Sequence, residues 1–231
     1  MMKVQWTAFF VAMFVLKHIF VNPLKRLLRR IHRREKMTEK EVRLEPVKLK
    51  TISIAIEGTS PLLMNKFSDS QKEEMMDKHL HRTKQKGVRD IELEVEEKIH
   101  KLPDGRVGFP SIGFKKAMVE VAPYLQGMNK KLAKGAFFIS DDLVPIEYDE
   151  MVINEAVVRL SGAGRVAQVR YRPQFNNWKC VLNIQYNANQ ISPEQIVNLA
   201  NLAGFHIGVG DWTPQRDGQY GMFMVATGEG E

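Results

Sequence analysis

The chain has 231 residues, of which 44% are apolar, and this composition is typical of a globular protein. Its single cysteine, Cys180, excludes an internal disulfide and a cysteine-rich zinc site. The net charge of +7 is unevenly distributed, because residues 1–36 hold nine of the 34 Lys and Arg residues and one of the 27 Asp and Glu residues. Residues 37–231 are nearly neutral, so nucleic-acid binding by this part would have to rest on local patches.

The N-terminal segment, residues 1–36, is first apolar and then basic. Val4–Val21 is close to the lower length limit for a bilayer span, and the basic residues after it would keep the rest of the chain in the cytoplasm. A second interpretation is that Met37 starts the natural protein and that residues 1–36 are an upstream extension. The leucines of the basic part have helical spacing, which also suits contact with an anionic membrane surface. The sequence leaves these interpretations open.

Residues 37–231 are expected to form one domain. It begins with a strand, Val47–Glu57, whose apolar face carries Ile52, Ile54 and Ile56. A highly charged segment over Ser68–Lys86 follows, which is expected to be a surface helix or a mobile insertion. Alternating apolar residues then predict a second strand over Asp90–Ile99, with Ile91, Leu93 and Val95 facing inward. A turn at Pro103-Asp104-Gly105 ends this region.

The next segment predicts a helix over Ser111–Gln126, with Ser111 as the N-cap and one apolar face. Three lysines after it form a basic cluster that we place in a loop: Lys130, Lys131 and Lys134. The middle of the chain predicts four short strands: Phe137–Ile139, Leu143–Tyr148, Val157–Leu160 and Val166–Tyr171.

The last elements are a strand over Trp178–Tyr186, a helix over Ser192–Gly204 with proline at its first position, and a strand over Tyr220–Ala226. The strong elements therefore run in the order β-α-β-β-α-β, which indicates an α+β fold with a ferredoxin-like, RRM-like core. Two β-rich insertions are expected, at about residues 65–110 and 127–172. The apolar and basic N-terminal helix would precede this core.

The loop Gly208–Phe223 is the strongest functional candidate. It contains four glycines together with Trp212 and Arg216, and bare amide N–H groups in such a loop can hold a phosphate. The glycine spacing matches neither a dinucleotide-binding fingerprint nor a P-loop. The alternative is that this segment only connects a helix to a strand.

Two segments resemble a known family. Phe109–Val121, FPSIGFKKAMVEV, resembles a helix opening in the repeat-associated RNA-binding (RAMP) superfamily, and the loop Gly208–Gly221 resembles the C-terminal glycine-rich loop of the same proteins. These are ferredoxin-like proteins that form the backbone of CRISPR effector complexes. The chain looks like a stand-alone or phage-encoded relative rather than a CRISPR subunit.

The resemblance implies binding of RNA or single-stranded nucleic acid along its phosphate backbone. It points to three residues at the helix opening, Ser111, Lys115 and Lys116. It points to four residues in the loop, Gly208, Gly210, Arg216 and Gly218.

A predicted hairpin adds a basic patch made of Arg159, Arg165, Arg170 and Arg172. Arginines beside aromatic rings suit a single-stranded ligand, because the charge binds phosphate and a ring stacks on a base. Trp212, beside two glycines, is the best candidate for contact with a base. The alternative for the hairpin is a solvated charged face.

From these observations we expect a non-catalytic, cytoplasmic protein that binds single-stranded RNA, or less favourably DNA, and that forms a homo-oligomer along the strand. No spacing of His, Asp and Glu resembles a metal site, so we expect no metal and no cofactor. Two alternatives stay open. One is a membrane-anchored structural protein that contacts the membrane through residues 1–36. The other is a metal-dependent ribonuclease that uses the acidic loop Asp141-Asp142.

Overall fold

The computed structural model describes residues 25, 27–30, 46–80, 90–159 and 167–226. The chain divides into two compact units, Met1–Pro46 and Val47–Glu231. In the first unit, residues 27–30 are helical, and the side chains of Leu27 and Leu28 are exposed. The apolar run behind the membrane-anchor interpretation lies outside the described residues. Among the residues that are described, no helix is both long and apolar enough to cross a bilayer.

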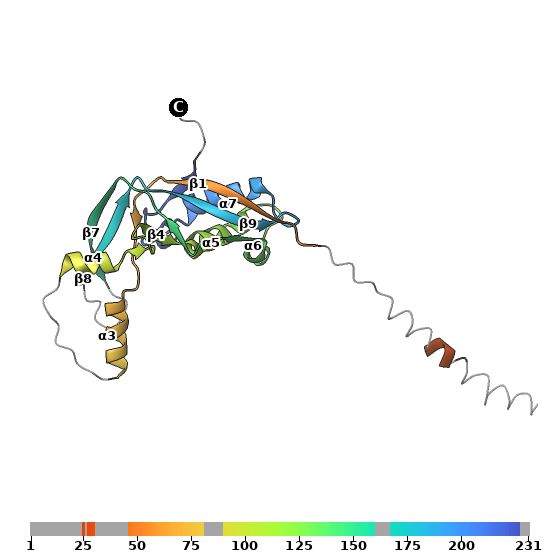
Figure 1. The fold of residues 1–231 in the computed structure, drawn as a ribbon, viewed down its shortest axis with the longest axis horizontal. Coiled ribbons are helices and arrows are strands. Elements are labelled where there is room, and N and C mark those ends of the chain that lie inside the picture. Colours follow the sequence, from red (N-terminus) through yellow and green to blue (C-terminus); the bar gives the residue numbers. More distant parts are fainter. Residues whose placement is uncertain (1–24, 26, 31–45, 81–89, 160–166, 227–231) are drawn as a thin grey trace, which may run out of the picture. The chain divides into compact units, whose positions relative to one another are not determined.

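The second unit is built on a four-stranded antiparallel sheet with the strand order β10-β1-β9-β5 (Figure 1). Its strands are β1 (Leu49–Gly58), β5 (Phe137–Ile139), β9 (Lys179–Asn187) and β10 (Phe223–Val225). Helix α5 (Ser111–Glu120) lies between β1 and β5 in the chain, and α7 (Pro193–His206) lies between β9 and β10. This is the expected β-α-β-β-α-β order, so the α+β prediction is confirmed. Strand β5 belongs to the sheet although it falls within the expected insertion 127–172.

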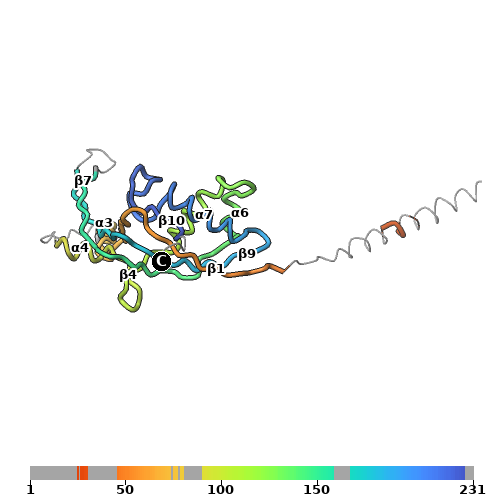
Figure 2. The backbone as a smooth tube through the Cα atoms, turned by 90° about the horizontal axis from the view of Figure 1, so that it is seen from above, coloured from red at the N-terminus to blue at the C-terminus, as the bar shows by residue number. Residues whose placement is uncertain are grey.

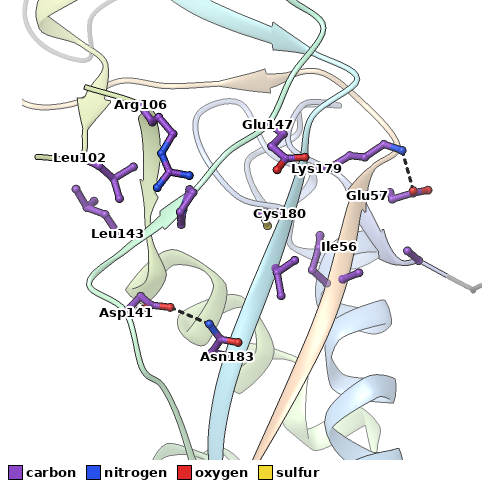
Figure 3. A pocket seen from close by; sticks show the side chains of 14 residues that line it. Ile56, Glu57, Leu102, Arg106, Asp141, Leu143, Glu147, Lys179, Cys180 and Asn183 are labelled. Carbon is purple, nitrogen blue, oxygen red and sulfur yellow. Dashed lines mark hydrogen bonds and ion pairs between the residues drawn. The ribbon is translucent and has the colours of Figure 1, made fainter. Parts of the chain in front are cut away.

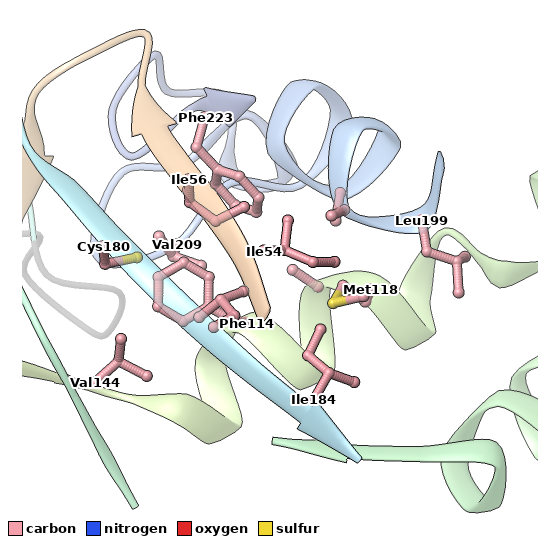
Figure 4. Packing of buried hydrophobic residues seen from close by; sticks show 14 of the residues in the cluster. Ile54, Ile56, Phe114, Met118, Val144, Cys180, Ile184, Leu199, Val209 and Phe223 are labelled. Atoms are coloured by element: carbon pink, nitrogen blue, oxygen red, sulfur yellow. The ribbon is translucent and has the colours of Figure 1, made fainter. Parts of the chain in front are cut away.

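The helices α5 and α7 contact each other and cover one face of the sheet (Figure 2). Alternate residues of β1 and β9 point toward them, and the register pairs Ile54 with Leu182 and Ile56 with Cys180. Phe114 of α5 is fully buried, with its ring centroid 5.5 Å from that of Phe223 (Figure 4). The apolar alternation of the strands and the apolar face of each helix therefore meet in one core.

Helix α7 begins at a capping box formed by Ser192 and Gln195. It was predicted to end at Gly204, but it continues to His206. A Cβ at Gly204 would lie 1.8 Å from the carbonyl oxygen of Phe223. This glycine is needed because helix and strand approach each other closely, and it does not end the helix.

Two smaller three-stranded sheets complete the unit. One contains β2 (Leu62–Leu63), β7 (Glu150–Arg159) and β8 (Ala167–Asn176). The other contains β3 (His100–Lys101), β4 (Val107–Pro110) and β6 (Leu143–Pro145). The strands β7 and β8 form an antiparallel pair with ten residue pairs between Glu150–Asn176 and Arg159–Ala167. They replace two predicted strands, Val157–Leu160 and Val166–Tyr171, and extend further from the tip than expected.

Helix α3 (Asp69–His79) lies where a charged helix was predicted, but α4 (Ile91–Glu97) replaces the predicted strand Asp90–Ile99. The strand prediction was wrong because Asp90 caps a helix: its Oδ1 accepts the N–H of Leu93 at 3.1 Å. Acidic residues in the first turn also favour the helix through its dipole. Of the three alternating apolar residues, only Val95 is buried.

The lysine cluster predicted as a loop forms helix α6 (Lys130–Ala136). The side chain of Asn129 caps it by accepting the N–H of Leu132 at 2.8 Å. Lys130 pairs with Glu120 of α5. This cap was not recognised in the sequence, so the helix was not predicted. The helix determines the direction in which each of the three lysine side chains points.

Candidate nucleic-acid interface

A groove of about 590 Å³ lies between α5 and the glycine-rich loop. The groove brings together residues from three separate parts of the sequence, and those that concern its chemistry are Lys115, Lys116, Lys134, Gly208, Gly210 and Arg216. Five of these six were predicted as binding residues. Lys134 was assigned to the basic cluster but not to the site, because the helix that directs it toward α5 was not predicted.

The groove is strongly cationic. Within the part of the chain that the structure describes, the amino groups of Lys115, Lys116 and Lys134 have no carboxylate partner, whereas the lining carboxylate Glu120 is paired with Lys130. The Nζ of Lys115 lies 3.6 Å from the ring centroid of Phe138. Burial lowers the pKa of Lys115, because its ammonium group has lost part of its hydration. An anionic ligand would compensate for that loss.

The N-terminus of α5 opens toward the same groove, through Ile112 and Gly113. The N-cap is Pro110, which makes no side-chain hydrogen bond to the helix. Ser111, predicted as the cap, is the first helical residue and is buried, and its N–H donates to the carbonyl oxygen of Asp142 at 3.0 Å. The uncapped N–H groups of the first turn carry the positive end of the helix dipole, which favours an anion.

Most N–H groups of the glycine-rich loop are already used. Gly208 donates to Ala203 at 2.9 Å, and Gly218 donates to Thr213 at 3.0 Å. From Gly208 to Thr213, all of which the structure describes, only the N–H groups of Gly210 and Thr213 have no hydrogen-bond partner. Both residues line the groove. This part of the loop therefore offers two amides to the groove rather than a full row of them.

The glycines of this loop are also required by the packing of the loop itself. Gly210 has a φ of 91°, and a Cβ there would lie 2.4 Å from the carbonyl oxygen of Leu63. A Cβ at Gly218 would lie 1.9 Å from the carbonyl oxygen of Trp212. The glycines are required because the loop packs tightly on itself and on the segment that contains β2.

Arg170 and Arg172, the two hairpin arginines whose side chains the structure describes, do not line this groove. Arg170 and Arg172 share one face of β8, as alternation requires. The guanidinium of Arg172 is buried, and its Nε lies 2.7 Å from Oδ2 of Asp211 in the glycine-rich loop. Arg170 donates from Nη2 to Oε1 of Gln168 at 3.0 Å. The side chain of Arg159 and the whole of Arg165 lie outside the described part of the structure.

Trp212, predicted to contact a base, is half-buried and has a φ of 51°. The guanidinium of Arg172 lies 5.1 Å from its ring centroid, and the ring of Tyr220 lies 6.4 Å away. These neighbours fix the orientation of the indole, and its partial exposure leaves one part open to solvent.

A further cavity, of about 580 Å³, lies on the sheet face opposite α5 and α7 (Figure 3). Its charged residues have mixed signs. Asp141 accepts a hydrogen bond from Asn183 at 3.3 Å, and Lys179 pairs with Glu57 at 3.0 Å. Burial raises the pKa of Cys180 to about 12, so its thiol is unreactive at neutral pH. Among the described residues, no group of three or more His, Cys, Asp or Glu side chains could hold a metal ion.

Comparisons with known proteins give a likeness in fold. No protein-family model and no curated protein matches the sequence. The type III-B Cmr-beta structure bound to cognate target RNA has a TM-score of 0.51 with 11% identity, over 87% of this chain and 65% of that chain. Cmr6 from Pyrococcus furiosus has a TM-score of 0.40 with 10% identity, over 78% and 100%. A Cas6 product complex has a TM-score of 0.30 with 10% identity, over 81% and 55%.

The likeness to the Cmr-beta structure shows a shared fold and agrees with the fold that the two sequence motifs predicted. The chain spans 65% of the length of that structure's matched chain.

Proposed function

We propose that this chain binds single-stranded nucleic acid along its phosphate backbone, in the groove between α5 and the glycine-rich loop, without catalysing a reaction. The observation that carries the proposal is the convergence of unpaired cations and free amides on one surface. Lys115, Lys116 and Lys134 have no carboxylate partner within the described part of the chain. Arg216 lies beside them with its side chain 70% exposed, and its Nη1 is 3.6 Å from Oδ1 of Asp211, so it is the one paired cation of the four.

The chemistry of the groove suits phosphates better than neutral or basic ligands. The amides of Ile112 and Gly113 in the first turn of α5, together with the N–H groups of Gly210 and Thr213, can donate to phosphate oxygens. The four cations supply charge. Ser111, Gly208 and Gly218 contribute by shaping the backbone rather than by direct contact. Contacts of this kind do not read base identity, so binding is expected with many sequences.

RNA is the favoured ligand. The structure whose fold resembles this chain, Cmr-beta, is bound to cognate target RNA, and this supports RNA over DNA here. We assign the activity to residues 37–231 and give residues 1–36 no part in contacting the strand. Neighbouring copies would line up along one strand, because backbone contacts that ignore base identity can repeat along a long ligand.

The experiment is a titration of a fluorescently labelled uridine oligonucleotide of about 12 nucleotides with the full chain, followed by anisotropy at several salt concentrations. With about four phosphate contacts, the slope of log K against log salt should be about −3 for a single strand. The Lys134→Gln variant should bind roughly threefold to tenfold more weakly and should reduce the slope by about 0.7.

The matched control is Lys131→Gln. Lys131 lies on the same helix and is exposed, but it does not line the groove. Its replacement should change the affinity by less than about twofold. Absence of binding by the unmodified chain at low salt would refute the proposal, and so would equal losses for the two lysine variants.

A further inference from the structure

A separate cavity of about 550 Å³ lies beside the β7–β8 hairpin, where the hairpin meets α3 and α4. The residues that determine its chemistry are Phe67, Met75, Lys98, Arg170, Arg172 and Asp211. Phe67 and Met75 form an apolar part of its lining, and Lys98, Arg170 and Arg172 form a part rich in N–H donors. Asp211 places this cavity at the glycine-rich loop, the same loop that borders the proposed backbone groove.

The donor part of the lining contains a hydrogen-bonding group without a partner. The side chain of Arg172 is only 8% exposed, and its Nε is paired with Asp211. Its Nη1 is enclosed and has no hydrogen-bond partner among the residues that the structure describes. A buried donor left unpaired costs free energy, so such a group usually indicates a missing ligand or water.

Lys98 adds a second buried cation to this lining. Its side chain is 3% exposed, and Nζ donates to Oε1 of Glu94 at 2.7 Å and to the carbonyl oxygen of Tyr171 at 2.5 Å. An ammonium group has three hydrogens, so these two hydrogen bonds leave one donor of Lys98 unused among the described residues. The ligand that fits must therefore present acceptors to this side of the cavity.

Phe67 and Met75 are apolar, unlike the cations that line the rest of this cavity, and they restrict the chemical class of the ligand further. Both side chains are 51% exposed, so each presents apolar surface beside a cationic wall. A phosphate would satisfy the donors but would leave this surface in water. A nucleobase satisfies both, because its face stacks on an aromatic ring while its edge accepts hydrogen bonds.

We infer that this cavity receives one unstacked base of the bound strand, and that the preferred base is guanine. Guanine presents two adjacent acceptors, O6 and N7, which match the two-pronged donor geometry of arginine. Adenine and cytosine each place an amino group on the corresponding edge, where it would face the N–H donors of Arg170 and Arg172. The inference rests on the proposed backbone binding and adds a preference for one base.

The test uses the full chain and three labelled RNA oligonucleotides of about 12 nucleotides: one of uridine only, one with a single central guanine and one with a single central adenine. The guanine strand should bind on the order of tenfold more tightly than the uridine strand, and the adenine strand should show no such gain. We assign the two-pronged contact to Arg170, which lines the cavity and would exchange its bond from Nη2 to Gln168 for the base. Arg170→Lys keeps the charge but removes this contact, so it should bring the guanine-to-uridine ratio close to one.

Two neighbouring methionines of α3 provide a matched pair. Met75 lines the cavity, whereas Met76 is 64% exposed and does not. Met75→Ala should reduce the guanine preference severalfold, and Met76→Ala should leave it unchanged. Circular dichroism verifies that both variants keep the fold.

The outcomes separate the two proposals. Equal affinity for the three strands would overturn the base preference and leave the backbone proposal intact. Loss of the preference in Met76→Ala to the same extent as in Met75→Ala would also overturn it, because the effect would then belong to the helix as a whole. If none of the strands binds, both proposals fail.

Discussion

The groove beside α5 and the β7–β8 hairpin are both rich in basic residues, but they differ in whether these residues have carboxylate partners. The lysines of the groove have no carboxylate partner among the described residues, and they stay available to an anion. In the hairpin, Arg172 is buried against Asp211 and Trp212. A basic residue in the sequence therefore indicates a binding surface only after its partners are known. The two regions therefore differ in role. The groove has the chemistry to bind phosphates, whereas Arg172 of the hairpin stabilises the glycine-rich loop through Asp211.

The largest effect on the free energy of unfolding is expected for the ion pair between Arg172 and Asp211. Arg172→Ala leaves the Asp211 carboxylate, 14% exposed, without its buried partner. Asp211 then keeps only the exposed Arg216 at 3.6 Å and a hydrogen bond from Asn65 at 3.3 Å, which compensate weakly. Removing one member of a buried pair costs about 3–5 kcal/mol, so the free energy of unfolding should fall by about that amount in urea denaturation. Arg170→Ala, two residues away on the same face, should cost less than about 0.5 kcal/mol. Similar losses for both variants would erase the distinction between the two regions.

The next largest effect is expected in the glycine-rich loop, at Gly210. Gly210→Ala forces a side chain into a left-handed conformation with a Cβ 2.4 Å from the carbonyl oxygen of Leu63. We expect a loss of about 2 kcal/mol or more in the free energy of unfolding. The control is Gly135→Ala, because Gly135 lies in α6 with no atom within 4 Å of a Cβ. This variant should be stabilised by about 0.5–1 kcal/mol. A harmless Gly210→Ala would show that the loop is loosely packed.

A smaller and more specific effect is expected at Lys115. Burial lowers its pKa in the folded protein, so the unfolded chain binds the proton more tightly. Stability should therefore rise with pH between the folded and the unfolded pKa of this group. A bound phosphate chain favours the ammonium form, so saturation with the uridine oligonucleotide should raise the pKa of Lys115. Titration of its side-chain NMR signal measures this shift, and an unchanged pKa would place the strand elsewhere.

Much of the fold could be predicted from the sequence, because the relevant signals are local. The alternation of Ile52, Ile54 and Ile56 predicted β1, and the proline after Ser192 marked the start of α7. The strand predicted at α4 failed because the same local signals conflicted there. Ile91, Leu93 and Val95 alternate as in a strand, while Asp90 and the glutamates after it favour a helix, and the helix prevailed.

The site could be predicted only in part. Lys115, Lys116, Gly208, Gly210 and Arg216 do line one groove, and motif resemblance was sufficient to select them. Lys134 was missed because its direction depends on a helix that was not recognised. The burial of Arg172 could not be predicted, because its partner Asp211 belongs to a different segment and only tertiary structure brings them together.

The outer strands of the main sheet, β5 and β10, are three residues each. The amide of Val225 in β10 donates to the Asn201 side chain of α7 at 2.8 Å, so a helix side chain occupies a site where another chain's backbone could attach. The shortness of both outer strands and the occupied amide of β10 discourage backbone pairing of one molecule with the next, which is a common route to insoluble fibrils. Under the proposed strand binding, the nucleic acid and not sheet pairing between copies would therefore set how neighbouring copies are arranged.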